Sequence, residues 1–119
     1  MEYSEIKRGM VVKVRNRYQN PAGHVIMGDR PAVVISNNKC NEYSPVIMVA
    51  YMTRSLKRLE MKTHVLLQHY NDLVLSVVKT EQIDTVDKTD ILAVITEIRS
   101  EDMIRINAAL MVSLGLEMA

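Results

Sequence analysis

Seven short apolar runs constrain what this chain can fold into more than any other feature. In each run, apolar side chains either alternate with polar ones or follow one another without a break, which is typical of β-strands. The runs cover residues 9–15, 31–36, 45–52, 63–68, 75–79, 82–86 and 91–96.

A single helical segment follows the runs. Ser100 can cap it, and Glu101 and Asp102 occupy its first turn, where the helix dipole favours acidic residues. The segment extends to about Leu114, and Gly115 supplies the stop. Its apolar stripe consists of Met103, Ile106, Leu110 and Leu114. Strands that precede one helix predict an α+β domain, in which a small, barrel-like antiparallel sheet packs against a C-terminal helix.

The pattern within each run predicts where its strand lies. Runs 31–36 and 45–52 are apolar at almost every position, which predicts central strands buried on both faces. The first run places Lys13 and Arg15 on one face, which we expect to look outward. Asparagines at both ends of 37–41 predict a turn.

The composition is that of one globular domain spanning residues 1–119. Phe and Trp are absent, so the core must come from aliphatic side chains, nine methionines and some of the five tyrosines. Cys40 is the only cysteine, which excludes an internal disulfide and leaves a zinc site without thiolate partners. No apolar run reaches the roughly 18 residues of a membrane span, and Met1 to Arg8 lacks a signal-like segment. We therefore expect a cytoplasmic protein without metal or cofactor.

Charge is distributed unevenly, although the net charge is only +1. Up to Lys62 there are eleven basic and five acidic residues, whereas from Thr63 onward there are four basic and nine acidic ones. Such asymmetry indicates nucleic acid or an oppositely charged partner. Residues 54–62 form a basic loop or a single helical turn, which either tracks a nucleic-acid backbone or is merely solvated.

Arg30 precedes a proline at the start of the second run. Pro31 fixes its own φ and pushes Arg30 toward an extended conformation, so the guanidinium is held at the mouth of a strand. A fixed guanidinium suits a phosphate, because it carries a permanent charge and a planar fork of donors. The alternative is a surface ion pair with Asp29 or another acid. Residues 16–29 form a long loop that delivers Arg30.

Several segments along nearly the whole chain carry a family resemblance. They are Lys7-Arg8-Gly9-Met10-Val11-Val12, Pro21-Ala22-Gly23, Gly28-Asp29-Arg30-Pro31-Ala32-Val33-Val34-Ile35-Ser36-Asn37, Asn41-Glu42-Tyr43-Ser44-Pro45-Val46-Ile47, Met52-Thr53, Thr63-His64-Val65, Glu81-Gln82-Ile83, Thr85-Val86-Asp87 and Ser113-Leu114-Gly115-Leu116. Together they resemble the MazF/PemK (Kid) family of toxin endoribonucleases, or mRNA interferases.

The resemblance implies a small SH3-like sheet, a homodimer and the toxin of a type II toxin-antitoxin system. It also implies sequence-specific, metal-independent cleavage of single-stranded RNA to 2′,3′-cyclic phosphate and 5′-hydroxyl ends, and a cognate antitoxin whose disordered tail occupies the RNA groove. The family's catalytic arginine and threonine correspond to Arg30 and Thr53.

The implied chemistry suits these residue types. When a 2′-hydroxyl attacks its own phosphate, negative charge builds on the phosphoryl oxygens, and Arg30 and Thr53 can stabilise it. His24 and His64 are the candidates for moving the proton, and His24 is the predicted third catalytic residue. The predicted RNA-binding residues are Gly23, Arg54, Lys57, Arg58, His64 and Gln82.

Each of these residues also has a purely structural reading. Thr53 can simply end a strand, His64 can be a structural hydrogen-bonding residue, and Gln82 can belong to a strand ladder. Tyr18, Tyr43 and Tyr51 either stack on bases or lie in the core or an interface.

The chain departs from the family pattern at Val25, Lys62 and Asp84, where acidic, proline and basic residues respectively are common. These departures leave the cleavage sequence open. The alternative function is that of a catalytically weak or inactive member that binds RNA or protein. A small barrel adaptor unrelated to RNA is a third reading.

Overall fold

A computed structural model of the chain describes residues 5–16 and 29–116. Six strands form one sheet in the order β4-β5-β3-β2-β1-β6, and every neighbouring pair is antiparallel. The strands are β1 (Met10–Val14), β2 (Arg30–Val34), β3 (Val46–Thr53), β4 (His64–Leu67), β5 (Ser76–Asp87) and β6 (Ile91–Glu97). The helices are α1 (Asn38–Tyr43), the 3₁₀ turn η2 (Lys88–Asp90) and α2 (Ser100–Ser113).

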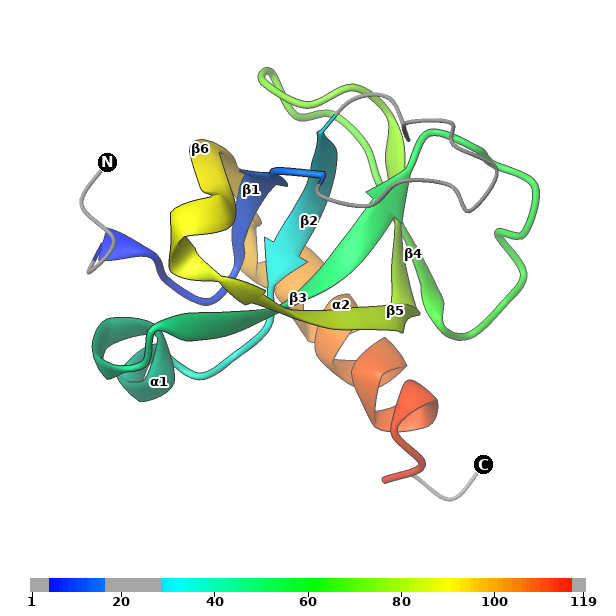
Figure 1. The fold of residues 1–119 in the computed structure, drawn as a ribbon. Helices are drawn as coiled ribbons and strands as arrows, with labels where there is room; N and C mark the ends of the chain where they lie inside the picture. The colour runs from blue at the N-terminus through cyan, green and yellow to red at the C-terminus, as the bar shows by residue number, and fades with distance from the viewer. Residues whose placement is uncertain (1–4, 17–28, 117–119) are drawn as a thin grey trace, which may run out of the picture.

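The sheet is strongly bent but open, since β4 and β6 lie at its two ends (Figure 1). The predicted α+β class is confirmed: the sheet is antiparallel, and the C-terminal helix α2 lies across one of its faces (Figure 1). Within the described residues, none of the helices has the length and apolar character needed to cross a membrane.

Two apolar cores explain the fully apolar strands. On one face, Val33 and Ala50 pack with Ile106 and Leu110 of α2. On the other face the bent sheet encloses a second core. The residues that alternate with Val33 and Ala50 along β2 and β3 belong to it, and it includes Val12, Val14, Ala32, Val34, Ile47, Val49 and Tyr51. β2 and β3 therefore bury both parities, as predicted for central strands. Lys13 is exposed, as expected.

One predicted break between strands is wrong. The runs at 75–79 and 82–86 are a single strand, β5. Between Ala50↔Ile83 and Met52↔Val78 the pairing advances two residues along β3 but five along β5, which is an irregular bulge. The polar Thr80-Glu81 step lies inside this bulge, so it interrupts the apolar pattern without ending the strand.

Three smaller expectations also need correction. Residues 37–41 are not a turn, because Asn37 caps α1 by accepting a hydrogen bond from the Cys40 backbone N–H. Ser100 is the first residue of α2, and Arg99 occupies the N-cap position. Leu114 lies at the C-cap and is 55% exposed, so it does not extend the buried stripe.

The end of α2 is set by Gly115, as predicted. Its φ is +70°, a left-handed conformation that glycine adopts without steric cost. The N–H groups of Gly115 and Leu116 donate to the carbonyls of Val112 and Met111, which is the Schellman arrangement.

Candidate active site

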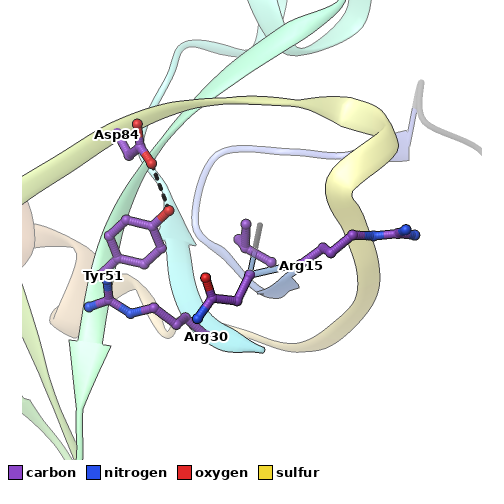
Figure 2. Close-up of a pocket in the computed structure, with 6 residues that line it drawn as sticks. Arg15, Arg30, Tyr51 and Asp84 are labelled. Carbon is purple, nitrogen blue, oxygen red and sulfur yellow. Dashed lines mark hydrogen bonds between the residues drawn. The ribbon is translucent and has the colours of Figure 1, made fainter. Parts of the chain in front are cut away.

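Arg30 lies at the start of β2, opposite Val14 of β1. Its guanidinium stacks on the ring of Tyr51, with the carbon Cζ 4.0 Å from the ring centroid (Figure 2). Its Nη2 donates to Oε1 of Gln82 at 3.2 Å. Asp29, the ion-pair partner considered above, instead accepts a hydrogen bond from the backbone N–H of Asn16 at 3.3 Å. Arg30 is thus exposed to solvent but fixed by two other strands.

Tyr51 is itself held in place. Its hydroxyl donates to Oδ2 of Asp84 on β5 at 2.8 Å, and the residue is only 9% exposed (Figure 2). Arg30, Tyr51 and Asp84 line a small pocket of about 110 Å³ together with Val14, Arg15 and Asn16. Because the guanidinium covers one face of the ring, that face is not available for a base.

Thr53 ends β3 and borders a larger groove of about 720 Å³. The ladder between β2 and β3 ends at Ala32↔Tyr51, before it reaches Arg30 and Thr53. Arg30 lines the small pocket and Thr53 lines the larger groove, so the two predicted catalytic residues border different cavities. The hydroxyl of Thr53 accepts a hydrogen bond from the Ser55 N–H at 3.1 Å. Within the described part of the chain no acceptor takes the proton of this hydroxyl, so the proton is available to a ligand.

The groove beside Thr53 has mixed walls. Lys13 and Arg54 bring positive charge to it, and Asp29 and Asp72 bring negative charge. Its other lining residues are mainly apolar: Pro31, Met52, Leu73, Val74, Ser76 and Ile95. A phosphate chain with unstacked bases needs this combination of basic and apolar surface.

The ring of His64 lies between two acceptors. Its side chain is 5% exposed, and its Nδ1 lies 2.9 Å from the carbonyl oxygen of Arg58 while Nε2 lies 2.8 Å from a carboxylate oxygen of Glu81. Both ring nitrogens therefore already face hydrogen-bonding partners. Burial raises the pKa of Glu81, but hydrogen bonds, first among them the one with His64, together outweigh burial and lower that pKa below its ordinary value. His64 thus fastens the 54–63 loop to β5.

The other predicted RNA-binding residues are scattered. Arg54, Lys57 and Arg58 are exposed on the loop that follows β3, but only Arg54 borders the groove. Gln82 touches Arg30 directly. Gly23 and His24, like Tyr18 and Val25, lie outside the described residues.

Comparison with known proteins decides the family. The model of the PemK-like, MazF-like toxin of type II toxin-antitoxin systems matches residues 7–114. This chain belongs to that family.

The toxin is similar to Endoribonuclease MazF of Staphylococcus epidermidis, with 37% identity over 91 residues, 75% of this chain and 76% of the relative. The fold of a mycobacterial endoribonuclease in complex with its cognate antitoxin is also similar, with a TM-score of 0.80 and 24% identity over 96% of this chain and 99% of that chain. MazE-MazF (Form-II) of Deinococcus radiodurans gives a TM-score of 0.77 and 20% identity over 94% and 97%. The predicted family and enzyme class, a toxin endoribonuclease, are confirmed.

Sequence reasoning missed the support beneath the toxin's arginine. Tyr51 was considered only for stacking or core packing, and Asp84 only as a departure from the family pattern. One signal was present: Gln82 and Asp84 are two residues apart and so point to the same side of a strand.

Proposed function

We propose that this toxin cleaves single-stranded RNA by internal transesterification, without a metal ion, at a site built on Arg30 and Thr53. The observation that supports the proposal is the guanidinium of Arg30, held by Tyr51 and Gln82 at the start of β2. A fixed cation suits a phosphate that gains negative charge, and the Thr53 hydroxyl would add a second donor.

In the proposed reaction the ribose 2′-oxygen forms a bond to the adjacent phosphorus, and the bond to the 5′-oxygen of the next nucleotide breaks. The products are a 2′,3′-cyclic phosphate and a 5′-hydroxyl. One proton leaves the 2′-hydroxyl and one reaches the departing oxygen. Both nitrogens of His64 already face acceptors, so of the two candidate histidines we assign the proton transfer to His24.

The groove beside Thr53 and the basic loop are the proposed path of the RNA. Arg54, Lys57 and Arg58 would neutralise phosphates, and Gln82 would act through Arg30 or at a base edge. Gly23 completes this predicted set.

The proposed partners of the toxin are a second copy of the chain and a cognate antitoxin. Residues 1–119 would act as one domain in the cytoplasm. An exposed apolar surface supports the dimer: Met48, Met111, Leu114 and Leu116 border a depression of about 320 Å³. The two solved relatives described above were each captured with an antitoxin.

The test is cleavage of a 5′-labelled mixed-sequence RNA in EDTA, with the cut ends identified by sequencing and by mass. The parent toxin should yield cyclic phosphate ends, and Arg30→Ala should leave the RNA intact while its circular dichroism spectrum is unchanged. Lys39→Ala, an exposed change on α1, is the control and should cut normally. Equal rates for Arg30→Ala and the parent would contradict the assignment, and intact RNA with retained binding by the parent would favour the inactive binding module.

A further inference from the structure

Arg30 is an exposed arginine with an ordered guanidinium, and its order needs a cause. Arginine carries several rotatable bonds, and fixing them costs free energy. Two contacts fix this one: the ring of Tyr51 on its face and the amide oxygen of Gln82 at its edge. Both supporting residues come from strands other than β2.

We propose that Tyr51 and Asp84 are positioning residues, which hold the guanidinium of Arg30 ready for the scissile phosphate. This inference rests on the ribonuclease function proposed above. It extends the site from the residues that would touch RNA to a second layer of side chains beneath Arg30.

The ring can serve as a platform because it is immobile. Tyr51 is 9% exposed and belongs to the core on this face of the sheet. Its hydroxyl is fixed by Asp84 at 2.8 Å, at the opposite end of the ring from the backbone (Figure 2). A guanidinium resting on such a ring is therefore placed by the sheet itself, through β3 and β5.

The carboxylate of Asp84 also has an electrostatic effect. It accepts a hydrogen bond from the phenol and so places negative charge near the hydroxyl, which makes the ring more favourable for a cation above it. Asp84 does this without forming an ion pair with Arg30 in the described part of the structure. Among residues 5–16 and 29–116, Gln82 is the one hydrogen-bond acceptor of the guanidinium, and its remaining N–H groups are available for phosphate oxygens.

This arrangement predicts which kinetic constant will change. Loss of the platform leaves the positive charge in the groove but lets the guanidinium move away from the position that the transition state requires. Substrate binding should change little, while the chemical step slows. If Tyr51 stacked on a base instead, its replacement would have the reverse effect: KM would rise and kcat would stay the same.

The experiment compares Tyr51→Leu, Tyr51→Phe and Asp84→Asn with Lys39→Ala, an exposed change on α1 that serves as the control. In single-stranded RNA cleavage, Tyr51→Leu should lose about tenfold in kcat with KM changed less than about twofold. Tyr51→Phe and Asp84→Asn, which keep the ring, should lose about threefold. Lys39→Ala should match the parent.

A second measurement does not depend on activity. In the ¹H–¹⁵N NMR spectrum of the toxin without RNA, the Arg30 side-chain Nε–H signal, identified by its absence in Arg30→Ala, should be displaced by the Tyr51 ring current. Tyr51→Leu should remove that displacement and Tyr51→Phe should retain it. Because phenylalanine preserves the buried ring, this pair remains informative even if the leucine variant does not fold.

The outcomes separate the two proposals. A parent toxin that leaves RNA uncut overturns the ribonuclease assignment, while the NMR shifts still test the platform. A parent that cuts, together with a Tyr51→Leu variant of equal kcat or with an Arg30 signal that no Tyr51 change moves, overturns the positioning role. A raised KM at constant kcat overturns it as well, because Tyr51 would then bind RNA directly.

Discussion

The hydroxyl of Thr53 is oriented from one side. The Ser55 N–H donates to it at 3.1 Å, which uses a lone pair and directs the remaining proton elsewhere. At the end of β3, beside the groove, a phosphoryl oxygen is the acceptor that the proposed reaction supplies. In the proposed reaction Thr53 would supply an oriented dipole and Arg30 a full charge.

Thr53→Val tests this role by removing the hydroxyl alone. Valine keeps the branched shape that suits a strand but has no hydroxyl. Removing one such donor from a site that stabilises developing negative charge costs about 100-fold in rate. We expect that loss in kcat of RNA cleavage with an unchanged melting temperature. Thr96→Val on β6 is the matched control, and a Thr53→Val variant as fast as this control would show that Thr53 only ends the strand.

At the scale of elements, Asp102 joins α2 to the loop that follows β4. Its side chain is 7% exposed and accepts hydrogen bonds from Tyr70 at 2.7 Å, Arg105 at 3.0 Å and Arg99 at 3.2 Å. Arg99 also stacks on the ring of Tyr70 and donates to the carbonyl of Gln68. The same loop continues into residues 72–74, which line the groove. The helix thus holds one wall of the groove in place.

The pKa of Asp102 makes this contact testable by pH. Burial raises that pKa, but the hydrogen bonds from Tyr70, Arg105 and Arg99 prevail and lower it below the ordinary 3.8. A carboxyl group whose pKa is lower in the folded state stabilises the fold above its unfolded pKa, and this stabilisation is lost as pH falls toward the folded value.

Asp102→Asn should therefore lower the free energy of unfolding by about 1–3 kcal/mol at pH 7. The difference from the parent should shrink as the pH falls below about 4. Urea unfolding between pH 7 and pH 3 measures it. Glu101→Gln, an exposed neighbour, should change stability by less than about 0.5 kcal/mol at any pH. A difference between Asp102→Asn and the parent that is independent of pH would show that charge plays no part.

The elements also show what sequence can and cannot predict here. β2 and β3 were predictable because a strand buried on both faces needs a nearly continuous apolar run, and the chain has such a run at each of them. Arg30 is indicated by the proline that follows it and by the family resemblance, and Thr53 by the resemblance alone; both stay predictions. The contact between Tyr51 and Asp84 depends on the register of β3 against β5 next to a bulge, and no local pattern determines that register. For the same reason the continuity of β5 through Thr80-Glu81 was missed.

At the scale of the whole molecule, the net charge of +1 is the sum of a basic part up to Lys62 and an acidic part from Thr63 onward. The basic residues that follow β3 lie on an exposed loop, fastened to β5 through His64 and Glu81. RNA binding releases counterions from phosphates, so its salt dependence counts the cations that engage them.

Salt dependence predicts how many of these cations contact RNA. For a single strand the slope of log K against log salt changes by about 0.7 per phosphate contact, so Lys57→Gln with Arg58→Gln should flatten it by about 1.4. Fluorescence anisotropy with a 2′-O-methyl RNA, which lacks the attacking hydroxyl, measures binding without cleavage. Lys39→Gln on α1 should leave the slope unchanged. An unchanged slope in the double variant would place the RNA away from this loop.

β1 and β6 are neighbours in the sheet although Met10 and Glu97, which pair across them, lie near opposite ends of the chain. During translation, Arg30 and Thr53 leave the ribosome long before Gln82, Asp84 and β6 have been made. A nascent or prematurely terminated polypeptide lacks Gln82 and Asp84, which support the guanidinium of Arg30 and the ring beneath it. It also lacks β6, one of the two neighbours of β1. If the proposed site is correct, we expect chains that end before β5 to leave RNA uncut, so that cleavage starts only once most of the chain has been made.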